Sequence, residues 1–152
     1  MKIIDTMEYV SALRELAEQG HEVSMTIAGN SMSPFLVHQR DTIAFKKKDR
    51  PLKRGDMVFF QRDSGQYVMH RILKKTSEGY YIVGDAQTAV EGPIREEQIF
   101  ARIHRVNRKG LWISDGDFWW EFFEKVWIRI VPLRPAVWRA YSVFAGIRNR
   151  FR

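Results

Sequence analysis

Apolar and polar residues follow helical spacing at the start of this 152-residue chain. Over residues 3–19 the apolar positions are Tyr9, Val10, Leu13, Leu16 and Ala17. Asp5 or Thr6 can cap this segment, and Gly20 can end it. The pattern predicts an N-terminal helix whose single apolar stripe packs against the rest of the domain. A helix that binds a partner or presents a substrate is the alternative.

From Glu22 onward the apolar pattern becomes typical of strands. Short segments rich in β-branched and aromatic residues alternate with Gly, Pro, Asp and Ser clusters. Asp63-Ser64-Gly65-Gln66 reads as a hairpin turn between two of them. The fold class that follows is mainly β (α+β), a coiled and mainly antiparallel β domain. The expected strands are 23–28, 42–46, 57–62, 66–73, 79–83, 99–106 and 110–114.

Residues 117–152 return to helical character, with Asp117 as a cap of a helix that extends to 128. Pro132 and Pro135 interrupt this run, and Pro135 can start a final helix to about residue 148. Half of the aromatic residues of the chain lie here. We therefore expect a domain over 1–116, with its core over 23–106, and an aromatic, basic helical extension over 117–152.

Charge distinguishes this extension from the rest of the chain. The net charge is +7, and residues 125–152 carry arginines and a lysine but no acid. Aromatic and basic residues on interrupted helices indicate a peripheral membrane contact. The alternative is that the aromatics pack on the β domain while the arginines face water. We do not expect a nucleic-acid partner.

Neither a transmembrane helix nor a secretory signal is expected from the sequence. It contains no apolar run of about 18 residues, and charged residues interrupt the N-terminal segment. A cytoplasmic and a peripheral membrane location both fit this pattern. The chain has no cysteine, which excludes disulfides and thiolate chemistry.

A serine-containing turn follows the strand predicted over 23–28. It reads Gly29-Asn30-Ser31-Met32-Ser33-Pro34, and it presents a hydroxyl close to backbone amides. Acyl transfer needs an exposed nucleophile beside such donors. Taken alone, however, a Gly-Asn-Ser cluster is common in ordinary turns and does not indicate a catalytic site.

Three further motifs follow this turn in order: Gly55-Asp56-Met57-Val58-Phe59, Val68-Met69-His70-Arg71-Ile72 and Gly84-Asp85-Ala86. With the serine turn, the set resembles the signal peptidase I family and its LexA-like relatives (the S24/S26 serine peptidases) over about residues 23–106. His70-Arg71 resembles the endoplasmic-reticulum-type branch, because the other branches have a lysine before the arginine. Members of the family usually span the membrane next to the catalytic domain, and this chain departs from that pattern.

The resemblance implies a role for each site residue. Ser31 would be the nucleophile and His70 the general base, which suits an imidazole that titrates near neutral pH. The pair Asp85 and Glu91 would orient His70, without a choice between them. The substrate would contact three residues of the serine turn, namely Gly29, Met32 and Pro34.

Two further expectations concern the oxyanion site and cofactors. Relatives often place a hydroxyl residue at the position of Gly29, so one oxyanion donor is expected to be missing. We expect neither a metal ion nor a cofactor.

The function that follows is a serine endopeptidase resembling signal peptidase. Its substrate would be a preprotein leader or a small precursor peptide, bound in extended form. One alternative is a LexA-like regulator that cleaves itself, although no helix-turn-helix pair precedes the core. The other is a non-catalytic module that binds membrane or nucleic acid through the basic tail.

Overall fold

The structure, a computed structural model, describes the backbone of residues 6–150 and the side chains of residues 8–147. Its centre is an eight-stranded sheet with the order β1-β2-β7-β3-β4-β5-β6, and β8 pairs with β7. Every paired neighbour is antiparallel. The strands are β1 Val23–Thr26, β2 Thr42–Lys46, β3 Met57–Gln61, β4 Tyr67–Thr76, β5 Gly79–Val83, β6 Glu91–Ile94, β7 Ile99–Arg108 and β8 Leu111–Ser114.

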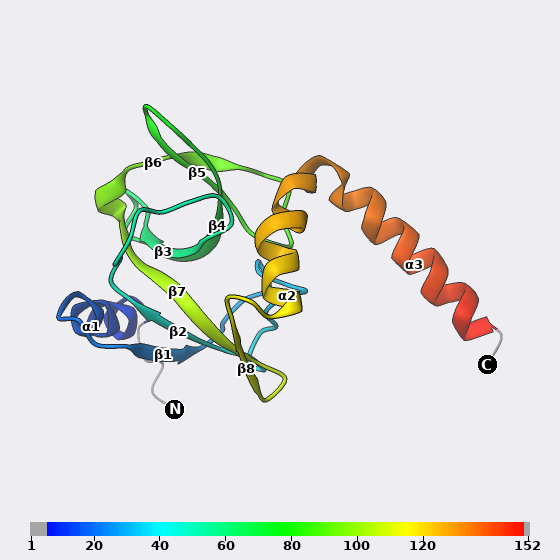
Figure 1. Cartoon of the computed structure of the whole chain (residues 1–152), viewed down its shortest axis with the longest axis horizontal. Helices are drawn as coiled ribbons and strands as arrows, with labels where there is room; N and C mark the ends of the chain where they lie inside the picture. Colours follow the sequence, from blue (N-terminus) through cyan, green and yellow to red (C-terminus); the bar gives the residue numbers. More distant parts are fainter. Residues whose placement is uncertain (1–5, 151–152) are drawn as a thin grey trace.

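The sheet is strongly coiled (Figure 1). Register shifts interrupt the pairing between Ala44 and Phe45 and between Phe59 and Phe60, with others in the β4–β5 and β5–β6 pairs. Bulges of this kind bend a strand and increase its twist, so the sheet curls around its own core. The predicted α+β fold with a coiled antiparallel sheet is confirmed.

Helix α1 spans Thr6–Glu18 and lies beside β1 and β2 (Figure 1). Val10 and Ala17 are buried in the main apolar core, which confirms the packing predicted for this helix. Gly20 has φ 95° and its amide bonds the Ala17 carbonyl, so it ends the helix as expected. The proposed capping residue Asp5 lies outside the described residues.

Strand β6 is absent from the sequence prediction. It contains Gly92 and Pro93, and both residue types are rare in strands. It lies at the edge of the sheet and pairs only with β5 among the described strands, where a proline is tolerated. A short 3₁₀ turn (η1, Glu96–Gln98) then leads into β7.

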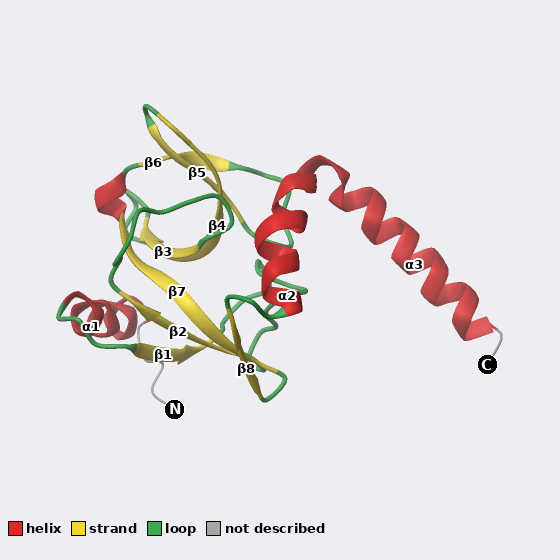
Figure 2. Cartoon of the chain, viewed as in Figure 1, coloured by secondary structure: helices red, strands yellow, loops and turns green. Residues whose placement is uncertain are grey.

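The C-terminal segment is more continuous than predicted. Helix α2 (Phe118–Glu121) passes into a π-helical turn (η2, Phe122–Val126) and a 3₁₀ stretch (η3, Trp127–Leu133). The kink falls at Ile130, with φ −113° and ψ 30°, and helix α3 then runs over Arg134–Arg150. The predicted start of the final helix, Pro135, is one residue from the observed one. Figure 2 shows these helices gathered at the end of the chain.

The two parts of this segment pack differently. The side chains buried against the β body lie between α2 and η3: Trp120, Phe123, Trp127, Ile128 and Val131. Helix α3 instead points away from the body (Figure 1). Among the described residues, no helix is both long and apolar enough to cross a bilayer.

Candidate active site

Ser31 lies in the turn that follows β1, and the Gly84-Asp85-Ala86 loop packs directly against its backbone. The amide of Ala86 donates a hydrogen bond of 2.9 Å to the Ser31 carbonyl oxygen. A Cβ atom on Gly84 would lie 2.5 Å from that same oxygen, closer than atoms in contact can approach. Only a glycine at position 84 allows the two backbones to approach this closely. Gly84 therefore lets the last sequence motif pack against the first one, the serine turn.

Ser31 and His70 line one cavity of about 670 Å³. His70 comes from β4, whereas Ser31 comes from the turn after β1, so the coiled sheet brings together segments far apart in the sequence. Most of the other lining residues are apolar: Val10, Met25, Ile27, Ile43, Phe59, Tyr67, Val68 and Met69. This space can hold an apolar side chain beside the serine hydroxyl.

The imidazole of His70 is almost fully buried, with 4% of the residue exposed. Its Nδ1 atom has no hydrogen-bond partner among the described residues. Burial lowers the pKa of His70 to about 4, because the cation loses its hydration; the charges of Glu91 and Asp85 oppose this effect. The ring is therefore neutral at physiological pH and able to accept a proton.

The carboxylate of Asp85 is bonded to Arg71 in this structure. Both of its carboxylate oxygens accept hydrogen bonds from Arg71, at 2.9 Å from Nε and 2.9 Å from Nη2. Both residues are fully buried, so the pair is a desolvated, bidentate ion pair. Asp85 is therefore bonded to the arginine of the His-Arg motif, and no hydrogen bond joins it to the His70 imidazole among the described residues.

The carboxylate of Glu91 is likewise paired with an arginine, Arg62. Its two carboxylate oxygens accept hydrogen bonds of 2.7 and 2.9 Å from Arg62. Glu91 begins β6, and its charge favours the His70 cation only through space. The two acids predicted to orient His70 thus act at a distance, and each neutralises a different arginine.

The Arg71–Asp85 pair also joins the second motif to the site. Arg71 donates a third hydrogen bond, of 2.8 Å, to the carbonyl oxygen of Gly55. Asp56 accepts hydrogen bonds from Arg50 and from the amide of Lys53, which fixes the loop before β3. The Gly55 and Gly84 motifs therefore meet at the buried guanidinium of Arg71, and the Gly84 loop in turn packs against the serine turn.

A comparison with protein-family profiles matches residues 2–104 to the family described as "Peptidase S24-like". This chain belongs to the peptidase S24-like family. Comparison with curated proteins and with solved structures gave no significant match. The family supports a serine peptidase or a LexA-like self-cleaving domain as the class of activity.

Two of the three substrate-contact residues predicted for this S24-like domain line the cavity. Gly29 and Met32 face it, whereas Pro34 is not among the lining residues. The Gly29 amide donates to Nδ1 of His38 at 2.7 Å, so it is not free to bind an oxyanion. No backbone hydrogen bond engages the Ser31 amide within the described part of the chain, which leaves that donor available. Phe35 and Leu36, which follow the serine turn, are fully buried in the main apolar core.

Sequence reasoning missed two residues that hold the Gly84-Asp85-Ala86 loop, which packs against the serine turn of this S24-like domain. Trp127 donates its indole N–H to the Asp85 carbonyl at 2.8 Å. The buried Arg134 donates to the carbonyls of Gly84 and Gln87 at 2.9 and 2.8 Å. Both residues lie beyond the family match, and the only signal in the sequence is an arginine beside Pro135 in an aromatic segment. The described residues that can hold a metal ion, on the β8–α2 turn and helix, do not line this cavity.

Proposed function

We propose that this S24-like protein is a serine endopeptidase in which Ser31 is the nucleophile and His70 the general base. The observation that carries the proposal is that both residues line the same cavity, which has a volume of about 670 Å³. Burial lowers the pKa of His70 to about 4, so the imidazole is neutral at physiological pH and can accept the serine proton, as a weaker base than an exposed histidine. No metal or cofactor enters this chemistry.

The reaction follows from the two groups. His70 takes the proton of the Ser31 hydroxyl as the oxygen attacks the peptide carbonyl carbon. The carbonyl π electrons move onto oxygen, and the Ser31 amide, which makes no backbone hydrogen bond among the described residues, would donate to this oxyanion. The imidazolium then returns the proton to the leaving amine, and water hydrolyses the acyl-enzyme by the same steps. Since no carboxylate among the described residues bonds His70 directly, its cation would depend on the more distant charges of Glu91 and Asp85.

An extended peptide is the substrate that this site fits best. Strand β1 lies at the edge of the sheet, and Met25 of this strand lines the cavity. An edge strand offers unpaired backbone groups to which a substrate can add as another strand. The apolar lining would then accept a small or medium apolar side chain next to the scissile bond.

Within the family, the sequence His70-Arg71 favours an endoplasmic-reticulum-type signal-peptidase-like enzyme, which cleaves a leader or a small precursor peptide. A self-cleaving regulator is the main alternative. Incubation of the purified protein alone separates the two: a self-cleaving regulator yields fragments that an intact-mass measurement detects, whereas the peptidase stays whole.

A serine-acylating probe tests the nucleophile. A fluorophosphonate or a lipophilic acylating probe is expected to add one mass label to the wild type, at Ser31. Ser31→Ala and His70→Ala are expected to abolish the label, whereas Ser64→Ala, which removes another hydroxyl lining the cavity, leaves it unchanged. Because enzymes of this type resist many standard reagents, cleavage of an extended peptide is measured in parallel. Cleavage that survives in Ser31→Ala would reject the proposal.

We also propose that helix α3 binds an anionic membrane surface. Val137, Tyr141 and Phe144 are exposed and share one helical face. The segment from residue 125 to the end of the sequence contains basic residues and no acid. A helix with exposed aromatic and aliphatic residues and an unbalanced positive charge suits a lipid headgroup layer, and the same charge opposes pairing with a second copy.

Vesicle flotation tests this contact. Wild-type protein is expected to float together with vesicles that contain phosphatidylglycerol. With neutral vesicles it should stay in the bottom fraction of the gradient while the vesicles rise. Phe144→Asp should abolish flotation, whereas Ser142→Asp, an equal charge change at another exposed position of the same helix, should retain most of it. If both variants lose flotation equally, the contact depends on net charge and not on the apolar face of α3. If both variants float as well as the wild type, α3 is not the membrane contact.

A further inference from the structure

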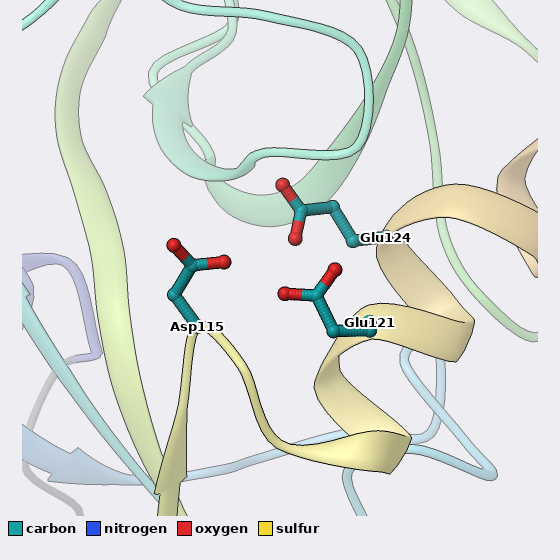
Figure 3. Close-up of side chains that lie close together, drawn as sticks. All are labelled: Asp115, Glu121 and Glu124. Carbon is teal, nitrogen blue, oxygen red and sulfur yellow. The ribbon is translucent and has the colours of Figure 1, made fainter.

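Three carboxyl groups converge where β8 leads into α2. Asp115, Glu121 and Glu124 each place a carboxylate oxygen within 4.8 Å of the others. Figure 3 shows the three side chains pointing into the same space, with Asp115 on the turn and the two glutamates on the helical segment. Carboxylates repel one another at such distances unless a positive charge lies between them.

Glu124 makes this arrangement unusual. The residue is only 6% exposed, although glutamate is almost never buried without full pairing. Its Oε1 atom lies 3.2 Å from the ammonium of Lys53, but its buried Oε2 atom has no hydrogen-bond partner among the described residues. A buried carboxylate oxygen without a partner is costly, so Oε2 is a donor atom available to a cation.

The nearby lysines do not satisfy the cluster. Lys53 and Lys125 are both more than half exposed and offer one ammonium each against three carboxylates. Lys125 bonds Glu121, whose other oxygen accepts the Gly116 amide at 2.9 Å. Asp115 and the Oε2 atom of Glu124 therefore remain without a cation of their own.

We propose that Asp115, Glu121 and Glu124 form a binding site for a divalent cation of the Ca²⁺ type. All three ligands are hard carboxylate oxygens, which select Ca²⁺, Mg²⁺ or Mn²⁺ over softer metals. Oxygens within 4.8 Å of one another can all reach one ion at Ca–O distances of about 2.3–2.6 Å. The adaptable geometry of a turn favours Ca²⁺ over Mg²⁺, which demands near-ideal octahedral ligands.

The site lies against the Gly55 loop. A Cβ atom on Gly55 would lie 2.3 Å from the carbonyl oxygen of Glu124, so the two backbones are in close contact. The Gly55 carbonyl in turn accepts a hydrogen bond from Arg71. A bound cation would fix the β8–α2 turn to the helical segment that packs on this loop, and it would thereby stabilise the fold. This inference does not depend on the peptidase proposal.

Terbium luminescence provides a direct test, because Tb³⁺ replaces Ca²⁺ in oxygen sites and neighbouring tryptophans of α2 can sensitise it. Full-length protein stripped with chelator is titrated with Tb³⁺, and the signal is then displaced with Ca²⁺ or Mg²⁺. We expect one saturable site, displaced by Ca²⁺ at about 1 mM or below and less effectively by Mg²⁺. Asp115→Asn and Glu124→Gln are each expected to weaken binding at least about tenfold, as for a lost ligand.

Asp63→Asn serves as the matched control, because Asp63 is an exposed acid that pairs only with Arg95. It should bind the ion as the wild type does. Glu124 is buried, so its variant could fail to fold, and the variant of the exposed Asp115, Asp115→Asn, therefore tests the site independently. In calorimetric unfolding, Ca²⁺ should raise the Tm of the wild type but not the Tm of Asp115→Asn. No saturable binding below several millimolar, or unchanged binding in Asp115→Asn, would overturn the proposal.

Discussion

The carbonyl oxygen of Ser31 accepts a hydrogen bond from the amide of Ala86, and the two groups are 2.9 Å apart. This bond joins the serine turn to a loop that follows β5, more than fifty residues later. The loop is held in turn by Arg71, Trp127 and Arg134. The position of the proposed nucleophile therefore depends on side chains from two distant parts of the chain, β4 and the C-terminal helical segment.

Gly84→Ala tests the close approach on which this arrangement rests. The added Cβ would lie 2.5 Å from the Ser31 carbonyl oxygen, so the two backbones must separate. We expect a loss of about 1–3 kcal/mol in the free energy of unfolding, typical of overpacking, and a larger loss of peptide cleavage. Urea unfolding and a cleavage assay measure the two effects. Gly146→Ala on α3 meets no atom within 4 Å and should leave both unchanged or slightly improved. A fully stable and active Gly84→Ala would show that the contact is dispensable.

Asp85→Asn tests the buried ion pair. The substitution keeps the shape of the side chain but leaves the Arg71 guanidinium buried without its anion. We expect a loss of about 3–5 kcal/mol in stability, the usual cost of removing one partner of a buried pair. Chemical denaturation measures it. The control is Asp63→Asn, which breaks an exposed pair and should cost at most about 1 kcal/mol. A similar small cost in both variants would contradict the buried pairing.

The pH dependence follows from His70. Its pKa in the folded protein is about 4, below the ordinary value near 6.5, because burial penalises the cation. The unfolded chain therefore binds more protons between these values, and His70 contributes stability that is present above about pH 6.5 and is lost as the pH falls toward 4. His70→Gln should flatten this part of the stability profile.

The same pKa predicts the acid limb of the pH–rate profile. If His70 is the base, kcat/KM for peptide cleavage should stay constant down to about pH 5 and fall with an apparent pKa near 4. A titration of the His70 ring by NMR is the direct check on the group. An acid limb near 6.5, together with an NMR pKa near 6.5, would contradict the buried, neutral imidazole.

Truncation tests where the folded unit ends. A chain of residues 1–116 loses Trp120, Phe123 and Trp127 from the core, and it should not fold stably. A chain of residues 1–135 keeps these residues and Arg134 and loses only the projecting helix. We expect it to unfold cooperatively, as judged by circular dichroism. Cooperative unfolding of 1–116 would instead support the boundary predicted from composition.

The sequence predicts the fold well where local patterns decide it. Seven of the strands and the N-terminal helix appear as short β-branched segments or as a clear helical stripe, and turn residues mark their ends. The sequence pattern does not predict strand β6, because Gly92 and Pro93 disfavour a strand. These residues lie in the sheet through the pairing of β6 with β5. Local propensity cannot reveal a strand that its neighbour imposes.

The candidate site divides in the same way. The motifs indicate Ser31 and His70, and the structure lines one cavity with both. The partners of Asp85 and Glu91 could not be predicted from the spacing of the motifs. In the fold, Arg71 binds Asp85 and Arg62 binds Glu91, and a bidentate arginine binds a carboxylate more strongly than a neutral histidine does. The role of Trp127 and Arg134 depends on how a distant helical segment docks, which no local pattern encodes.

The most direct measurement of the central claim is a double-mutant cycle on peptide cleavage. Rates are compared for the wild type, Ser31→Ala, His70→Ala and the double variant, with folding of each checked by circular dichroism. If the two residues act as one unit, each single substitution should reduce kcat by several orders of magnitude and the double variant should be no slower than either. Strictly multiplicative losses, or near-wild-type cleavage in either single variant, would contradict a Ser31–His70 catalytic pair.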